Sequence, residues 1–159
     1  MRKSVALLLL LMLVLGTSIC SASDDQNKVT QDLLDKYQEM QYSVEAGITK
    51  VDYGRQYREL YIATQKAQGK IPQETYDKFL DAMKSYDNAS TFWGKQYPVY
   101  YLSDVKGYVD DINRFKNEAL RDVMGRFYKD SVVSYILGEA NDKTRALTKE
   151  LQSKLKESD

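Results

Sequence analysis

The sequence predicts an all-α protein: an N-terminal signal peptide followed by an antiparallel bundle of four to five helices. Apolar residues recur every three or four positions along most of the chain, which is the period of a helix with one buried face. Glycine and proline are confined to a few places, and no alternating run of β-branched residues is long enough to predict a strand. Short links between amphipathic helices favour antiparallel neighbours.

Residues 1–22 have the pattern of an export signal. A basic start precedes an apolar run of about ten residues, which is too short for the roughly twenty apolar residues of a membrane span. Cleavage after Ala22 would follow small residues at the last and third-last positions of the signal. We therefore expect a signal peptide over residues 1–22, a polar tether over residues 23–28 and a single helical-bundle domain over residues 29–159.

Cys20 is the only cysteine, and the sequence leaves two fates open for it. It is either cut away with the signal or becomes the lipid-modified first residue of a bacterial lipoprotein. The polar stretch after Cys20 favours lipidation, whereas Thr17 and Ile19 do not match the usual lipoprotein box. In either case the folded part has no free thiol and no disulfide, so packing alone must hold it together.

The first two predicted helices cover residues 30–46 and 52–68. Each carries one apolar stripe, and each is followed by a glycine that tolerates the left-handed conformation of a helix end, Gly47 and Gly69. Thr49 has the position of an N-cap for the second helix, with an acidic residue three places later.

The remaining predicted helices cover residues 72–93, 103–127 and 131–156. Pro72 suits the first helical position, where its missing N–H costs nothing. A non-helical stretch follows over residues 94–102. Ser103 is the expected cap of the fourth helix, whose end Gly125 weakens, and Asn141 and Asp142 could interrupt the fifth.

Histidine is absent, which removes the usual general base near neutral pH and the commonest metal ligand. This excludes Ser-His-Asp and Cys-His catalysis, His-based zinc sites and His-ligated haem. We expect no catalytic residue, no metal site and no cofactor. The 23 basic residues balance 23 acidic ones, so the chain has no basic footprint for nucleic acid. A membrane contact is expected only through the signal peptide or a lipid on Cys20.

The densest aromatic cluster lies in the predicted loop after the third helix. It contains Trp93, Tyr97, Tyr100 and Tyr101. Loops carry many binding residues, and Trp and Tyr are enriched at binding hot spots. These four residues are the candidate contact for a ligand or protein partner; the alternative is a loop that folds back to close the end of the bundle.

A second aromatic pattern places Tyr53, Tyr57 and Tyr61 at intervals of four on one helix face. Such a face either lines a ligand cavity between helices or forms a core seam with the phenol groups pointing to a partner or to solvent. On the fourth predicted helix, Asp111, Glu118 and Asp122 share a face that could hold a divalent cation. The interleaved Arg114 and Arg121 favour a ladder of salt bridges instead.

Two spacings carry a resemblance. The chain has a Gly-x-x-x-x-Asp-Tyr motif at residues 47–53 and a Tyr-x-x-Ala-x-x-x-Trp motif at residues 86–93. Over roughly residues 40–95 it resembles small exported helical proteins of bacteria. The resemblance implies a helical fold and a bacterial origin and carries no activity with it.

These observations favour an exported, non-enzymatic cell-envelope protein that binds a protein partner. The alternative is a small-ligand carrier or sensor with a tyrosine-lined cavity between its helices.

Overall fold

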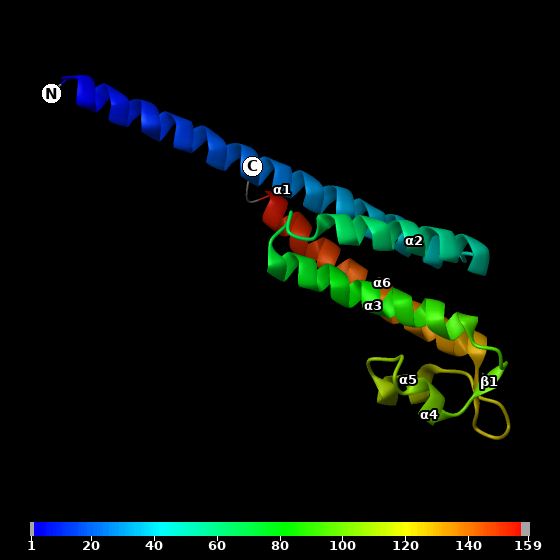
Figure 1. Cartoon of the computed structure of the whole chain (residues 1–159). Coiled ribbons are helices and arrows are strands. Elements are labelled where there is room, and N and C mark those ends of the chain that lie inside the picture. The colour runs from blue at the N-terminus through cyan, green and yellow to red at the C-terminus, as the bar shows by residue number, and fades with distance from the viewer. Residues whose placement is uncertain (1, 157–159) are drawn as a thin grey trace.

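The computed structural model describes the backbone of residues 2–156 and the side chains of residues 24–154. The predicted signal peptide, with Cys20 and Ala22, lies outside the residues whose side chains are described. The described residues form six helices and two short strands, which confirms the all-α class (Figure 1). In chain order these are α1 (Arg2–Glu45), α2 (Lys50–Ala67), α3 (Gln73–Gly94), β1 (Val99–Tyr100), α4 (Leu102–Val105), α5 (Ile112–Glu118), β2 (Phe127–Tyr128) and α6 (Lys129–Lys156).

The four long helices α1, α2, α3 and α6 lie side by side and enclose one core (Figure 1). Contacts join α1 to α2, α2 to α3, α3 to α6 and α6 back to α1, and the α3–α6 contact is the most extensive. The chain reverses direction between successive long helices. The short elements between α3 and α6 form an insert beside the end of α3 and the start of α6.

The ends of the first helices follow the predicted signals. Gly47 and Gly69 have φ values of 86° and 71°, a conformation that glycine adopts without the penalty of a Cβ atom. The hydroxyl of Thr49 accepts the N–H of Asp52 at 3.2 Å and caps α2 as predicted. The backbone of residues 23–28, predicted as a tether, lies within α1.

The single fourth helix predicted over residues 103–127 is wrong. The structure has the short helices α4 and α5 there, separated by a non-helical link. The carboxylate of Asp111 accepts the N–H groups of Asn113 and Arg114 at 2.9 and 3.0 Å, so a new helix begins at this point. Ser103, the expected cap, lies inside α4, and the N-cap position belongs to Tyr101.

The chain after α5 forms a turn and the strand β2, which pairs antiparallel with β1, in place of helix. Val99 pairs with Tyr128, and Tyr100 pairs with Phe127. Gly125 has a φ of 74° in the turn before β2, a value that a helix does not allow.

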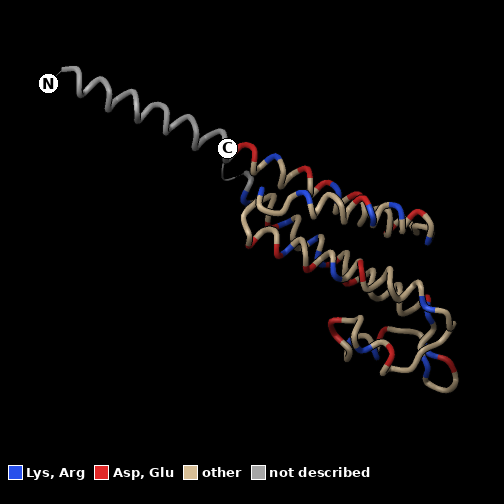
Figure 2. The backbone as a smooth tube through the Cα atoms, viewed as in Figure 1, with Lys and Arg blue, Asp and Glu red and all other residues tan. Residues whose placement is uncertain are grey.

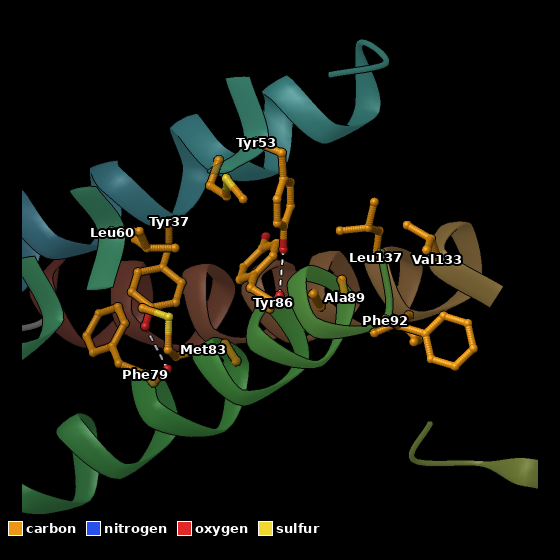
Figure 3. Close-up of a cluster of buried hydrophobic side chains, with 14 of the residues drawn as sticks. Tyr37, Tyr53, Leu60, Phe79, Met83, Tyr86, Ala89, Phe92, Val133 and Leu137 are labelled. Atoms are coloured by element: carbon orange, nitrogen blue, oxygen red, sulfur yellow. Dashed lines mark hydrogen bonds between the residues drawn. The ribbon is translucent and has the colours of Figure 1, made fainter. Parts of the chain in front are cut away.

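The core is crossed by buried tyrosines whose hydroxyl groups join different helices (Figure 3). Tyr37 of α1 donates to the carbonyl oxygen of Phe79 in α3 at 2.8 Å and lies 3.1 Å from the hydroxyl of Thr64 in α2. Tyr53 of α2 donates to the carbonyl oxygen of Tyr86 in α3 at 2.6 Å.

Tyr86 completes this set by connecting α3 to α6. Its hydroxyl donates to Oδ1 of Asn141 at 3.0 Å and lies 3.2 Å from the hydroxyl of Thr144. Burial raises the pKa of Tyr86 to about 12 and raises those of Tyr37 and Tyr53 further. Asn141 and Thr144 are themselves buried, so the Tyr86 hydroxyl and these two side chains pair with one another inside the core.

Outside the core, charges of both signs alternate along the described chain (Figure 2). Among the described residues, no helix combines the length and apolar character that a membrane span needs.

Replacing Tyr86 with Phe tests the tyrosine network. Tyr86→Phe keeps the ring but leaves buried Asn141 and Thr144 short of a partner, so we expect the free energy of unfolding to fall by roughly 1–3 kcal/mol. Urea denaturation followed by circular dichroism measures this change. Tyr61→Phe, at an exposed position on α2, is the matched control and should stay within about 0.5 kcal/mol of the parent. Equal stabilities of the two variants would contradict the role of the Tyr86 hydroxyl.

Candidate functional site

The aromatic loop, residues 93–101, is fixed in place by the start of α6. The pairing of β1 with β2 joins the loop to the residues directly before α6, and the N–H of Lys129 donates to the carbonyl oxygen of Pro98 at 2.8 Å. The ammonium group of Lys129 also donates to the carbonyl oxygen of Lys95 at 3.3 Å. The loop therefore has a defined conformation supported by main-chain hydrogen bonds.

Tyr100 anchors the loop to the core. It is buried, its ring meets that of Phe92 edge-on at 4.8 Å, and its hydroxyl accepts the N–H of Tyr97 at 2.9 Å. The ammonium group of Lys95 lies 5.4 Å from the centre of the Phe92 ring and 5.8 Å from that of Tyr100, within the range of a cation–π interaction. For Tyr100 the structure fits the interpretation of a loop that closes the end of the bundle.

Tyr97 and Tyr101 are presented to solvent instead, with 67% and 62% of their surface exposed. Residues alternate between the two sides of a strand, so the side opposite buried Tyr100 belongs to Val99 and Tyr101. Tyr97 and Tyr101 contribute to an open hollow of about 540 Å³, called here the tyrosine hollow. It is lined by Lys95, Gln96, Tyr97, Pro98, Val99, Tyr100, Tyr101, Asp104 and Arg126.

Trp93 is separated from this hollow. Its ring packs against Tyr53 of α2 with the ring centres 5.4 Å apart, and it lines a different hollow of about 350 Å³ beside α6. Of the four residues predicted as one contact surface, the structure brings Tyr97, Tyr100 and Tyr101 together and leaves Trp93 on another side of α3.

The sequence pattern did not predict two charged residues of the tyrosine hollow as site residues. They are Asp104 and Arg126. Asp104 accepts the N–H of Tyr101 at 2.9 Å and so fixes the backbone beneath the exposed ring. Arg126 pairs with Asp122 through N–O distances of 2.7 and 2.8 Å. The pattern Asp-x-x-Gly at residues 122–125, typical of a tight turn, was the available signal for this local structure.

Asp122 organises the turn over residues 122–126, called here the Asp122 turn. Its Oδ1 accepts the N–H groups of Met124 and Arg126 at 3.0 and 2.9 Å. Burial works to raise the pKa of Asp122, but these amide bonds and the guanidinium of Arg126 outweigh it, so the pKa lies below its usual value.

The tyrosine face of α2 changes from core to surface along its length. Tyr53 is buried and stacks parallel to the ring of Tyr57, whose hydroxyl donates to Asp87 at 2.7 Å, while Tyr61 is exposed. The main hollows formed by the described residues are lined by other side chains. In the described part of the chain, this face serves to pack α2 on α3.

The acidic residues considered for a cation do not share one continuous helix face, because α5 ends at Glu118 and Asp122 lies in the turn after it. Asp111 caps α5, Glu118 pairs with Arg114 at 2.8 Å, and Asp122 pairs with Arg126. No cluster of three or more His, Cys, Asp or Glu residues among those described could hold a metal ion.

A polar hollow of about 560 Å³ lies between α5 and α6, and Glu139 is its half-buried carboxylate. Burial raises the pKa of Glu139, although its oxygens accept the N–H groups of Asp110 and Asp111 at 3.1–3.2 Å. Glu139 therefore attaches the link between α4 and α5 to α6, and both of its carboxylate oxygens already accept hydrogen bonds from that link.

Comparison with protein-family models, with curated proteins and with solved structures finds no match to the chain.

Acidification should loosen the Asp122 turn only below the usual pH range of an aspartate. A lowered pKa means that the ionised carboxylate stabilises the fold at pH values above the unfolded-state pKa, and that this contribution is lost as the pH falls through the lower folded-state pKa. We expect the amide proton shifts of Met124 and Arg126 in NMR spectra to titrate together, with a midpoint below 3.8. Asp122→Asn, which cannot titrate, should abolish this transition; a midpoint at or above 3.8 would contradict the assignment.

Proposed function

We propose that the chain is an exported, non-enzymatic cell-envelope protein that binds a protein partner through the tyrosine hollow. The observation that carries the proposal is the exposure of Tyr97 and Tyr101 on a loop that buried Tyr100 and the pairing with β2 hold in one conformation. An exposed aromatic pair on a rigid support binds a partner without the entropy cost of ordering a mobile loop.

The chemistry of the tyrosine hollow suits a protein partner. Tyrosine rings offer a large contact area with few rotatable bonds, and a hydroxyl at the ring tip can form hydrogen bonds. Lys95, Asp104 and Arg126 place charged groups of both signs at the same surface. A partner segment with an apolar side chain between polar groups would complement this arrangement.

The absence of histidine and the occupied carboxylate of Glu139 support a binding role over catalysis. Two further carboxylates of the polar hollow take part in ion pairs, Glu118 with Arg114 and Asp142 with Arg145. Among the described carboxylates of this hollow, Glu139 has a raised pKa, and its oxygens already accept backbone N–H groups.

The export half of the proposal rests on residues 1–22. We expect the intact mass of protein purified from the envelope of an expressing bacterium to be that of a chain that begins at Ser23, after cleavage at Ala22. A chain that begins at Cys20 with added lipid would replace cleavage at Ala22 with membrane anchoring and keep export. Retention of residues 1–22 in the purified protein would contradict export.

Alanine substitution tests the partner surface. The double variant Tyr97→Ala/Tyr101→Ala removes both exposed rings and leaves the anchor Tyr100 in place, so we expect recovery of envelope partners in a crosslinking pull-down to fall by about tenfold or more. Tyr42→Ala/Tyr61→Ala removes two exposed tyrosines on α1 and α2 and is the matched control. Unchanged recovery with Tyr97→Ala/Tyr101→Ala, with circular dichroism matching the parent, would refute the tyrosine hollow as the contact.

A further inference from the structure

The Asp122 turn presents apolar side chains to solvent. Val123 is fully exposed, and Met124 and Leu120 expose 73% and 71% of their surface. In Figure 1 the chain between α5 and α6 loops away from the long helices, and these residues lie in that loop. Three neighbouring aliphatic residues with such exposure contrast with the other apolar positions of the insert, where Val105, Phe115 and Phe127 are buried.

The exposure of Val123 and Met124 is imposed by ordered structure. Besides the two amides that its carboxylate accepts, Asp122 donates its own N–H to the carbonyl oxygen of Arg126 at 2.8 Å and accepts the N–H of Gly125 at 3.0 Å through its carbonyl oxygen. The turn is thereby closed by four hydrogen bonds around one residue. The two apolar side chains are held outward before any contact is made, which lowers the entropy cost of insertion into another phase.

Basic residues flank this apolar tip in the sequence, although the carboxylates of Glu118 and Asp130 also lie in this stretch. Lys116, Arg121 and Lys129 lie close to it along the chain, and none of them takes part in the ion pairs of the described residues. The guanidinium of Arg121 lies over the ring of Phe127 at 5.0 Å and donates to the carbonyl oxygen of Lys116. The only carboxylate within the turn, Asp122, is neutralised by Arg126.

We propose that the Asp122 turn is a membrane-surface anchor for anionic bilayers. Val123 and Met124 insert among the upper acyl segments, and Lys116, Arg121 and Lys129 contact the phosphate groups around them. An apolar tip with flanking cations matches the layered chemistry of a bilayer surface, where acyl chains lie beneath negative headgroups. The proposal rests on observations other than those that carry the partner contact, and it does not use Tyr97 or Tyr101.

A fluorescent reporter at the tip tests insertion directly. Val123→Cys in a Cys20→Ser background of the full chain carries a single polarity-sensitive NBD label, and Val51→Cys on α2 provides the matched control because Val51 is also strongly exposed. The probe is a vesicle of phosphatidylcholine with about 30% phosphatidylglycerol, compared with a vesicle of phosphatidylcholine alone. Measuring the label separates insertion of the turn from any membrane binding by residues 1–22.

We expect the emission of the label at position 123 to shift to the blue with anionic vesicles, to shift far less with neutral ones, and not to shift at position 51. The charge-removing variant Lys116→Gln/Arg121→Gln/Lys129→Gln should weaken the response by about tenfold or more, because each cation near an anionic surface contributes to binding. Addition of salt should weaken the response of the parent in the same direction.

Three results would overturn the proposal. One is the absence of a shift at position 123 while the chain sediments with the vesicles. Another is an equal shift with neutral vesicles, which would remove the role of the cations. The third is capture of an envelope protein that depends on Val123 and Met124 without any vesicle response, because a protein pocket would then be the occupant of the tip.

Discussion

The fold depends on the hydrogen bonds of three buried tyrosine hydroxyls. Tyr37, Tyr53 and Tyr86 each place a hydroxyl in the core. A buried hydroxyl without a partner would destabilise the folded state by more than a formed hydrogen bond stabilises it. Every one of these hydroxyls finds its partner on another helix, so the network is complete only when α1, α2, α3 and α6 are all in place. Since the chain has a single cysteine and can form no internal disulfide, this network provides specificity that some small domains obtain from disulfides.

The same core determines where the insert can lie. Phe92, at the end of α3, packs its ring against Tyr100 and also against Tyr108, with ring centres 5.3 Å apart in the second pair. On α6, Glu139 accepts the backbone N–H groups of Asp110 and Asp111, and Lys143 joins Asp110 to Asp81 of α3 at 2.7 and 3.0 Å. The insert therefore rests on the most extensive helix contact of the protein, and this rigid base fixes the tyrosine hollow.

The long helices were predictable because each has an apolar stripe of helical period bounded by a glycine or a cap, as at Gly47 and Gly69. The segment 103–127 has the same period, but there the carboxylate of Asp111 begins a new helix and the positive φ of Gly125 ends any continuation. Local hydrogen bonds therefore prevent one continuous helix here, despite the helical spacing of the apolar residues. Tyr97 and Tyr101 were predicted as site residues on a loop. Arg126 was not predicted as a site residue, because it lies at the hollow only through the antiparallel pairing of β1 with β2, which no local sequence pattern encodes.

Arg126 makes the two proposed surfaces interdependent. Its guanidinium lines the tyrosine hollow and at the same time pairs with Asp122, the residue that closes the turn carrying Val123 and Met124. A partner that placed a carboxylate in the hollow would compete with Asp122 for this guanidinium and weaken the support of the turn. Conversely, insertion of the turn into a bilayer would require the closed turn and with it the Arg126–Asp122 pair, which would leave the hollow with less free positive charge. By thermodynamic linkage the two effects must be equal in magnitude, so a partner with an acidic contact would bind less tightly to the membrane-associated form.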